Sequence, residues 1–183
     1  MIKEHADNVM RMSTKTALIH RTPWLLIGLF GGIFSAKIVE FFETTLQRNI
    51  ILAAFIPLIV YMADAVGTQM ESFIIRDAAI HPKLNFTKYL FKQIFVVSMM
   101  GVLISGSLFL ISLYLYNNVS VSLTLALSLF FAILSSVVTG LIIPFLFERT
   151  RLDPANASGP IATIIQDILS VSIYFFIASV ILR

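Results

Sequence analysis

The sequence predicts an all-α integral membrane protein that crosses the bilayer five times, and three observations support this fold class. The 183-residue chain is 58% hydrophobic and 13% charged, with a mean hydropathy of +0.92, whereas a soluble domain is about half apolar and about a quarter charged. Its apolar residues gather in five long runs without the period-2 alternation of membrane β-strands. Lysines and arginines lie almost entirely between these runs.

Each apolar run is long enough to span the hydrocarbon core as a helix, which takes about 20 residues. A helix also satisfies its own backbone polar groups, as lipid requires. Pro23 suits a first helical turn, and Asn117–Asn118 suit a short turn. Residues 151–159 read as a loop in which Ser158 caps a helix opened by Pro160. The predicted spans are 23–42, 50–75, 91–116, 121–147 and 160–182.

The basic residues outside the spans predict the orientation. Ten lysines and arginines fall on the side that holds the N-terminus, and two, Arg48 and Arg183, fall on the other. By the positive-inside rule the N-terminus is cytoplasmic and the C-terminus is outside. We therefore expect a cytoplasmic segment over residues 1–22 and a five-helix transmembrane domain over 23–183, in a prokaryotic inner or plasma membrane. The small net charge of +3 gives no reason to expect a nucleic-acid partner.

Small residues form a ridge on the first span, where Gly28, Gly32 and Ala36 recur every four residues, and the third span carries Gly101 and Ser105. Such ridges let helices approach closely in lipid. We expect packing within one subunit, with a subunit interface as the alternative.

Ionisable residues within spans are costly and suggest function. Lys37 and Glu40 lie three residues apart and can neutralise each other, and Glu43 lies at the outer interface. We expect these three to be structural, with an outer vestibule for cations as the alternative. Asp64 and Asp167 have no basic residue within four positions. At 1.5 Å per residue they lie about 16 Å and about 10 Å from the cytoplasmic ends of their helices. They belong either to a cation site or to hydrogen bonds between helices.

Oxygen-bearing residues share a helix face with each acid. A chain with no cysteine and no histidine near these acids favours Mg²⁺ or Ca²⁺ over Zn²⁺. Pro57 and Gly67 are expected to break the second span and expose backbone carbonyls. The two faces hold Asp64, Gly67, Thr68 and Glu71 in the second span, and Thr163, Asp167 and Ser170 in the fifth.

Two segments resemble the MgtE magnesium-transporter family. Residues 55–76 (FIPLIVYMADAVGTQMESFIIR) are similar to its second transmembrane helix. Residues 152–167 (LDPANASGPIATIIQD) resemble its L-D-P-A-x-A-S-G segment and the helix that follows, with an Asp eight residues beyond the Gly. The resemblance runs from Pro23 to the C-terminus in the same five-span order.

The resemblance implies a homodimer in the lipid bilayer with a cation pore at the subunit interface, lined by the second and fifth helices. It implies that Asp167 of each subunit faces a hydrated Mg²⁺, the bound and transported ion. Gly67, Thr68 and Gln69 match the family's G-T-Q positions, and Thr163 matches a pore-side Thr. Asp64-Ala65 stands where the family usually has Gly-Asn, a change that could alter selectivity.

A further departure concerns regulation, because many members carry large cytoplasmic sensor domains before the first span. Only residues 1–22 precede it here. If this is the whole protein, gating by such domains is either missing or supplied by a separate cytoplasmic chain; the alternative is that the sequence is a piece of a longer protein. Two other interpretations stay open beside a transporter. One is an intramembrane aspartyl-type enzyme, although no Ser/His or His/carboxylate arrangement lies at membrane depth, so an enzyme is not expected. The other is a non-transporting membrane scaffold subunit.

Overall fold

The computed structural model describes residues 10–81, 83–148 and 154–182, and the described part of the chain is helical. Within these ranges, five helices are long and apolar enough to cross a membrane. The elements are α1 (Thr14–Phe41), α2 (Glu43–Arg48), α3 (Ile51–Ile80), α4 (Phe86–Tyr116), α5 (Val119–Val137), the π-helical turn η2 (Val138–Ile142), α6 (Ile143–Glu148) and α7 (Pro154–Ile181). Helix α5, η2 and α6 together form the fourth predicted span.

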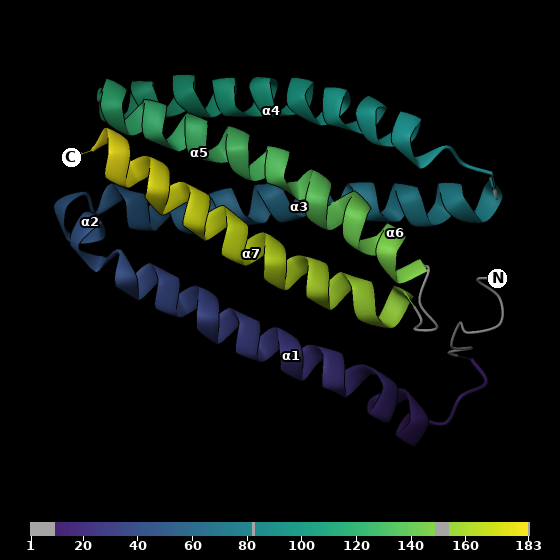
Figure 1. Cartoon of the computed structure of the whole chain (residues 1–183). Coiled ribbons are helices and arrows are strands. Elements are labelled where there is room, and N and C mark those ends of the chain that lie inside the picture. Colours follow the sequence, from purple (N-terminus) through teal and green to yellow (C-terminus); the bar gives the residue numbers. More distant parts are fainter. Residues whose placement is uncertain (1–9, 82, 149–153, 183) are drawn as a thin grey trace.

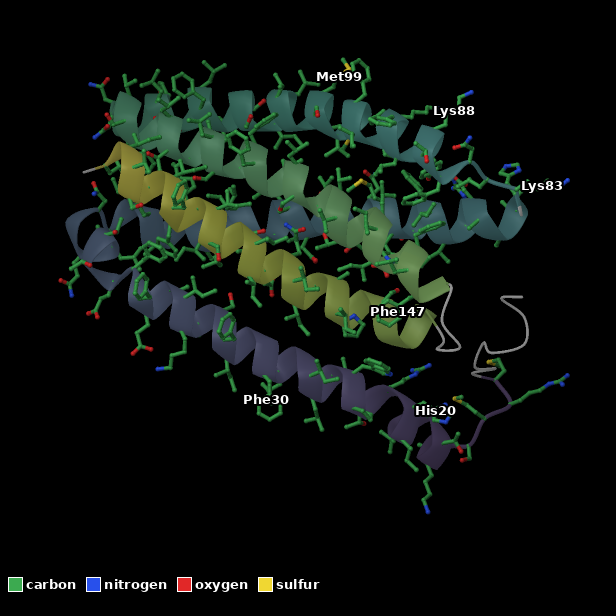
Figure 2. All side chains as sticks on the ribbon, in the orientation of Figure 1. His20, Phe30, Lys83, Lys88, Met99 and Phe147 are labelled. Carbon is green, nitrogen blue, oxygen red and sulfur yellow. The ribbon has the colours of Figure 1, made fainter. Side chains whose placement is uncertain are left out.

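The bundle is built around α3, α5 and α7, which contact one another (Figure 1). Helix α4 packs mainly on α5, and α1 packs mainly on α7, so these two helices cover opposite sides. Phe30 on α1 and Met99 on α4 point outward (Figure 2) and are 70% and 54% exposed, as suits side chains that face lipid. The beginning of α1 and the end of α7 lie at opposite ends of the bundle.

Aromatic residues pack the end of the bundle where α1, α3 and α7 meet. Tyr174 and Phe175 on α7 are fully buried. The Tyr174 hydroxyl donates a 2.8 Å hydrogen bond to the Leu52 carbonyl on α3. Phe42 stacks on Phe175 with ring centroids 5.1 Å apart. These contacts fasten α7 to α3 and to the end of α1.

Three helices are capped at their N-termini by a polar side chain that accepts a backbone hydrogen bond. The side chains of Ser13, Asn85 and Asn118 accept backbone N–H groups at the starts of α1, α4 and α5. Asn117 has a φ of 48°, a left-handed conformation that asparagine tolerates. The predicted turn at Asn117–Asn118 is confirmed.

Four helices, α1, α4, α5 and α7, begin earlier than predicted, and a predicted break is absent. Helix α1 begins at Thr14 and α7 at Pro154, so Pro23 and Pro160 lie inside helices rather than at their starts. Pro57 and Gly67, which are expected to break the second span, lie inside α3, which continues through both. A proline within a helix removes one hydrogen bond, and neighbouring groups in a helical bundle can compensate for the loss. Ser158 is therefore not a helix cap, and 154–159 is helix; residues 151–153 of the predicted loop lie outside the described residues.

The small-residue ridge predicted on the first span does not pack within the subunit. A side-chain carbon added at Gly28 or Gly32 would meet no atom within 4 Å, whereas one at Gly31 would overlap Ile164 on α7. The glycine that permits close packing is thus Gly31. In the third span the prediction is confirmed, because Gly101 is buried against Phe130 of α5.

Candidate functional site

Three carboxylates lie between α3 and α7. Asp64 and Glu71 are seven residues, or about two helical turns, apart on α3, so they share a face, and Asp167 lies on α7. All three are half-buried. Asp64 is near enough to both Asp167 and Glu71 for direct electrostatic repulsion. The predicted similar depth of Asp64 and Asp167 agrees with this arrangement.

Hydroxyl groups of α7 bind the acids of α3. Thr163 forms a side-chain hydrogen bond with the Asp64 carboxylate. Further along, the Ser158 hydroxyl donates a 2.6 Å hydrogen bond to Glu71 Oε1. Within the described ranges the ion pairs are Lys37–Glu40 and Arg76–Asp77, and none involves these three acids. Half-buried carboxylates without a basic partner are stabilised by a cation or by protonation.

Residues beside the acids are exposed at the surface of the subunit. These are Thr68 on α3 and Thr163 on α7. Gln69 is exposed too, but it is five residues from Asp64 and therefore faces a different side of α3. In the part of the chain that the structure describes, no three His, Cys, Asp or Glu side chains are placed to hold a metal ion together. The side chains of Thr68 and Thr163 therefore lie at a surface that the described helices of the subunit leave exposed.

Gly67 is three residues from Asp64, close to the same face of α3, and is buried at a helix crossing. A side-chain carbon added at Gly140 in η2 would overlap the Gly67 carbonyl oxygen. The same addition at Gly67 would lie 3.4 Å from the Thr139 hydroxyl. The two glycines thus let the backbones of α3 and η2 approach closely. The structure brings Asp64, Thr163 and Asp167 together, and Gly67 lies beside them where α3 crosses η2.

Gln166 and Thr139 are candidate functional residues that are absent from the site predicted from the sequence, which is built around two acids. Both are buried, and the Thr139 hydroxyl donates a 2.6 Å hydrogen bond to Gln166 Oε1. An uncharged amide inside an apolar run is the signal that could have identified Gln166, because polar side chains in membrane spans form hydrogen bonds between helices. Gln166 also directly precedes Asp167.

The fold and the site define a multi-pass α-helical membrane protein with acids inside its spans that form no ion pair with another described residue, the kind of side chain that marks ion pathways. A family model, MgtE, described as a divalent cation transporter, matches residues 56–177. The chain belongs to this family. The family is described as one of transporters, and the five apolar helices agree with a multi-pass membrane protein.

Three curated relatives are named "Magnesium transporter MgtE". The protein from Bacillus subtilis is 33% identical over 165 residues, covering 89% of this chain and 37% of the relative. The protein from Enterococcus faecalis is 29% identical over 184 residues, covering 100% of this chain and 40% of the relative. The protein from Thermus thermophilus is 25% identical over 165 residues, covering 89% of this chain and 36% of the relative. The chain therefore spans between 36% and 40% of the length of these relatives.

Proposed function

We propose that this chain carries divalent cations, Mg²⁺ above all, across the membrane through a pore between two copies of itself. The observation that supports this most directly is the approach of Asp64 and Asp167 at a lateral surface, with Thr163 beside them. A two-fold axis next to this surface would double each ligand, as isologous dimers do. Helices α3 and α7 of both subunits then line the pore.

The chemistry of these ligands suits a hydrated divalent ion. Mg²⁺ dehydrates reluctantly and usually keeps several waters while binding through one or two carboxylates. Two copies of Asp167 supply two negative charges at one level, which match one divalent cation. Asp64, Thr163 and Thr68 contribute further oxygen atoms where α3 and α7 meet, whereas Gln69 faces another side of α3. In this proposal Gly67 acts through the close approach of α3 and η2.

The names of the relatives support Mg²⁺ as the transported ion and are the reason to place it first. The unequal distribution of lysines and arginines between the two sides supports the proposed orientation, with the N-terminus in the cytoplasm and the C-terminus outside. Residues 1–22 remain the proposed cytoplasmic segment, of which residues 14–22 are helical.

Ion flux into proteoliposomes tests the proposal. The parent protein should take up Mg²⁺, and Asp167→Asn should lose most of this flux, because the substitution removes two charges per dimer from a medium less polarisable than water. Glu43→Gln is the matched control, since Glu43 is an exposed acid at the start of α2 that bonds Gln47. Parent-level flux in folded Asp167→Asn would refute the proposed site.

The subunit arrangement needs its own measurement. Native mass spectrometry of the protein in detergent should find a dimer. A monodisperse monomer that still transports Mg²⁺ after reconstitution would contradict the interfacial pore.

A further inference from the structure

A largely buried polar network surrounds Gln166, the residue before Asp167. Gln166 is 1% exposed. Its side-chain oxygen accepts a 2.6 Å hydrogen bond from the Thr139 hydroxyl. Its side-chain nitrogen donates to the Ser170 hydroxyl at 2.9 Å, the Ser135 hydroxyl at 3.2 Å and the Ala132 carbonyl at 3.3 Å. The amide is therefore bonded to α5, to η2 and to its own helix.

This network determines how α7 is rotated. Successive side chains on a helix point about 100° apart. Because Gln166 is anchored toward α5 and η2, the neighbouring Asp167 is directed away from them. Its carboxylate then lies near Asp64 on α3. Rotation of α7 about its axis would leave the buried amide without partners, which is costly where there is no water to replace them.

The same network extends to α3. Thr139 precedes Gly140, which packs against the Gly67 backbone, and Gly67 lies less than one helical turn from Asp64. The chain of contacts thus runs from Gln166 through η2 to the segment of α3 that holds Asp64. The turn η2 is π-helical, a local widening that interrupts an α-helix and is often found at functional sites.

We propose that Gln166 is a positioning residue for cation binding, which acts through Thr139 and η2 to set the separation between Asp167 and Asp64. The inference rests on the proposed function, because it concerns the same carboxylates. Mg²⁺ requires near-octahedral geometry, so a small change in the spacing of two carboxylates changes affinity and the preference for Mg²⁺ over the larger Ca²⁺. A residue that merely held helices together would affect stability and leave both of these quantities unchanged.

The experiment compares the variants Gln166→Leu, Thr139→Val and Thr139→Ser with the parent in proteoliposomes. Thr124→Val is the matched control. Its hydroxyl is also buried on the same span, but it donates to the Ser120 carbonyl of its own helix at 2.8 Å. The readouts are the half-saturating Mg²⁺ concentration, the ratio of Mg²⁺ to Ca²⁺ flux, and the melting temperature in detergent.

We expect Gln166→Leu and Thr139→Val each to raise the half-saturating Mg²⁺ concentration about fivefold or more and to lower the preference for Mg²⁺. The double variant should be little worse than the single variants, because both remove the same contact. Thr139→Ser keeps the hydroxyl and should restore affinity toward the parent value, whereas Thr124→Val should match the parent.

Two outcomes would overturn the inference. If Gln166→Leu and Thr139→Val lower only the melting temperature, with half-saturation and selectivity as in the parent, Gln166 is a packing residue. Thr139→Val preserves side-chain volume and decides the question if Gln166→Leu fails to fold. If the parent itself carries no divalent cation, the proposed function fails together with this inference, so the two failures are distinguished by the parent's own flux.

Discussion

Ser158 on α7 donates a 2.6 Å hydrogen bond to Glu71 on α3, and the two residues are 87 positions apart in the chain. Ser158 is fully buried, whereas Glu71 is half-buried. This bond fastens the beginning of α7 to α3 about two helical turns from Asp64. The bond lies in the contact between α3 and α7, the two helices proposed to line the pore. Its contribution to stability can be measured.

Removing the Ser158 hydroxyl should destabilise the protein, and removing the Glu71 charge should not. Ser158→Ala leaves a half-buried carboxylate without its donor, at a cost of about 1–3 kcal/mol. Glu71→Gln keeps an oxygen that accepts from Ser158 and avoids the desolvation of a charge. Thermal unfolding in detergent should place Glu71→Gln at or above the parent and Ser158→Ala below it.

Ser72→Ala is the control for this pair, because its hydroxyl bonds the Thr68 carbonyl of its own helix on an exposed surface. It should melt with the parent. Equal melting temperatures for Ser158→Ala and Ser72→Ala would show that the contact between α3 and α7 contributes nothing to stability.

Gly140→Ala should weaken the crossing of α3 and η2. The added methyl would overlap the Gly67 backbone, which cannot move aside as a side chain can, and overpacking of this kind costs about 1–3 kcal/mol. Gly106→Ala on α4 is the control, since a methyl group there meets no atom within 4 Å. We expect a lower melting temperature and reduced flux for the first substitution only. A Gly140→Ala protein as stable and active as Gly106→Ala would contradict the close approach.

Cysteine labelling tests the proposed orientation, because the chain contains no cysteine. Ser120, in the first turn of α5, and Lys83, before α4, are exposed at opposite ends of the bundle (Figures 1 and 2). In intact cells, an impermeant thiol reagent should label Ser120→Cys and spare Lys83→Cys until the membrane is permeabilised. The reverse pattern would place the N-terminus outside.

Asp64→Asn should change cation preference or affinity without stopping transport. The asparagine retains an oxygen that can accept from Thr163 but loses the charge that lies near Asp167. Flux should be measured for Mg²⁺, Mn²⁺, Co²⁺ and Ca²⁺ under identical conditions. If the variant matches the parent for every ion, the role of Asp64 is restricted to contacts between helices.

Much of the site is predictable from the sequence because acids in an apolar run are conspicuous. Asp64 and Asp167 stand out by their lack of nearby basic residues, and their similar depth follows from the helical rise alone. Lys37 and Glu40 are expected to pair and do form an ion pair. Such predictions use distances along one helix, which are the same in every α-helix.

The contacts between helices are not predictable in the same way. The sequence predicts that the ridge of Gly28 and Gly32 packs within the subunit, yet Gly31 does so. The buried bond between Gln166 and Thr139 joins residues 27 positions apart and depends on a π-helical turn with no clear sequence signature.

The sequence by itself determined the class of protein, the number of spans and the depth of the acids, because hydropathy and helical rise are properties of each segment alone. Only the tertiary structure decided which face of α7 meets α3, and hence that Asp167 approaches Asp64 while Gln166 is buried against η2. The physical reason lies in the solvent. Lipid is as apolar as the side chains that it surrounds, so hydrophobicity does not select which helix faces meet. That choice depends on close packing at Gly31, Gly67 and Gly140 and on a few buried hydrogen bonds.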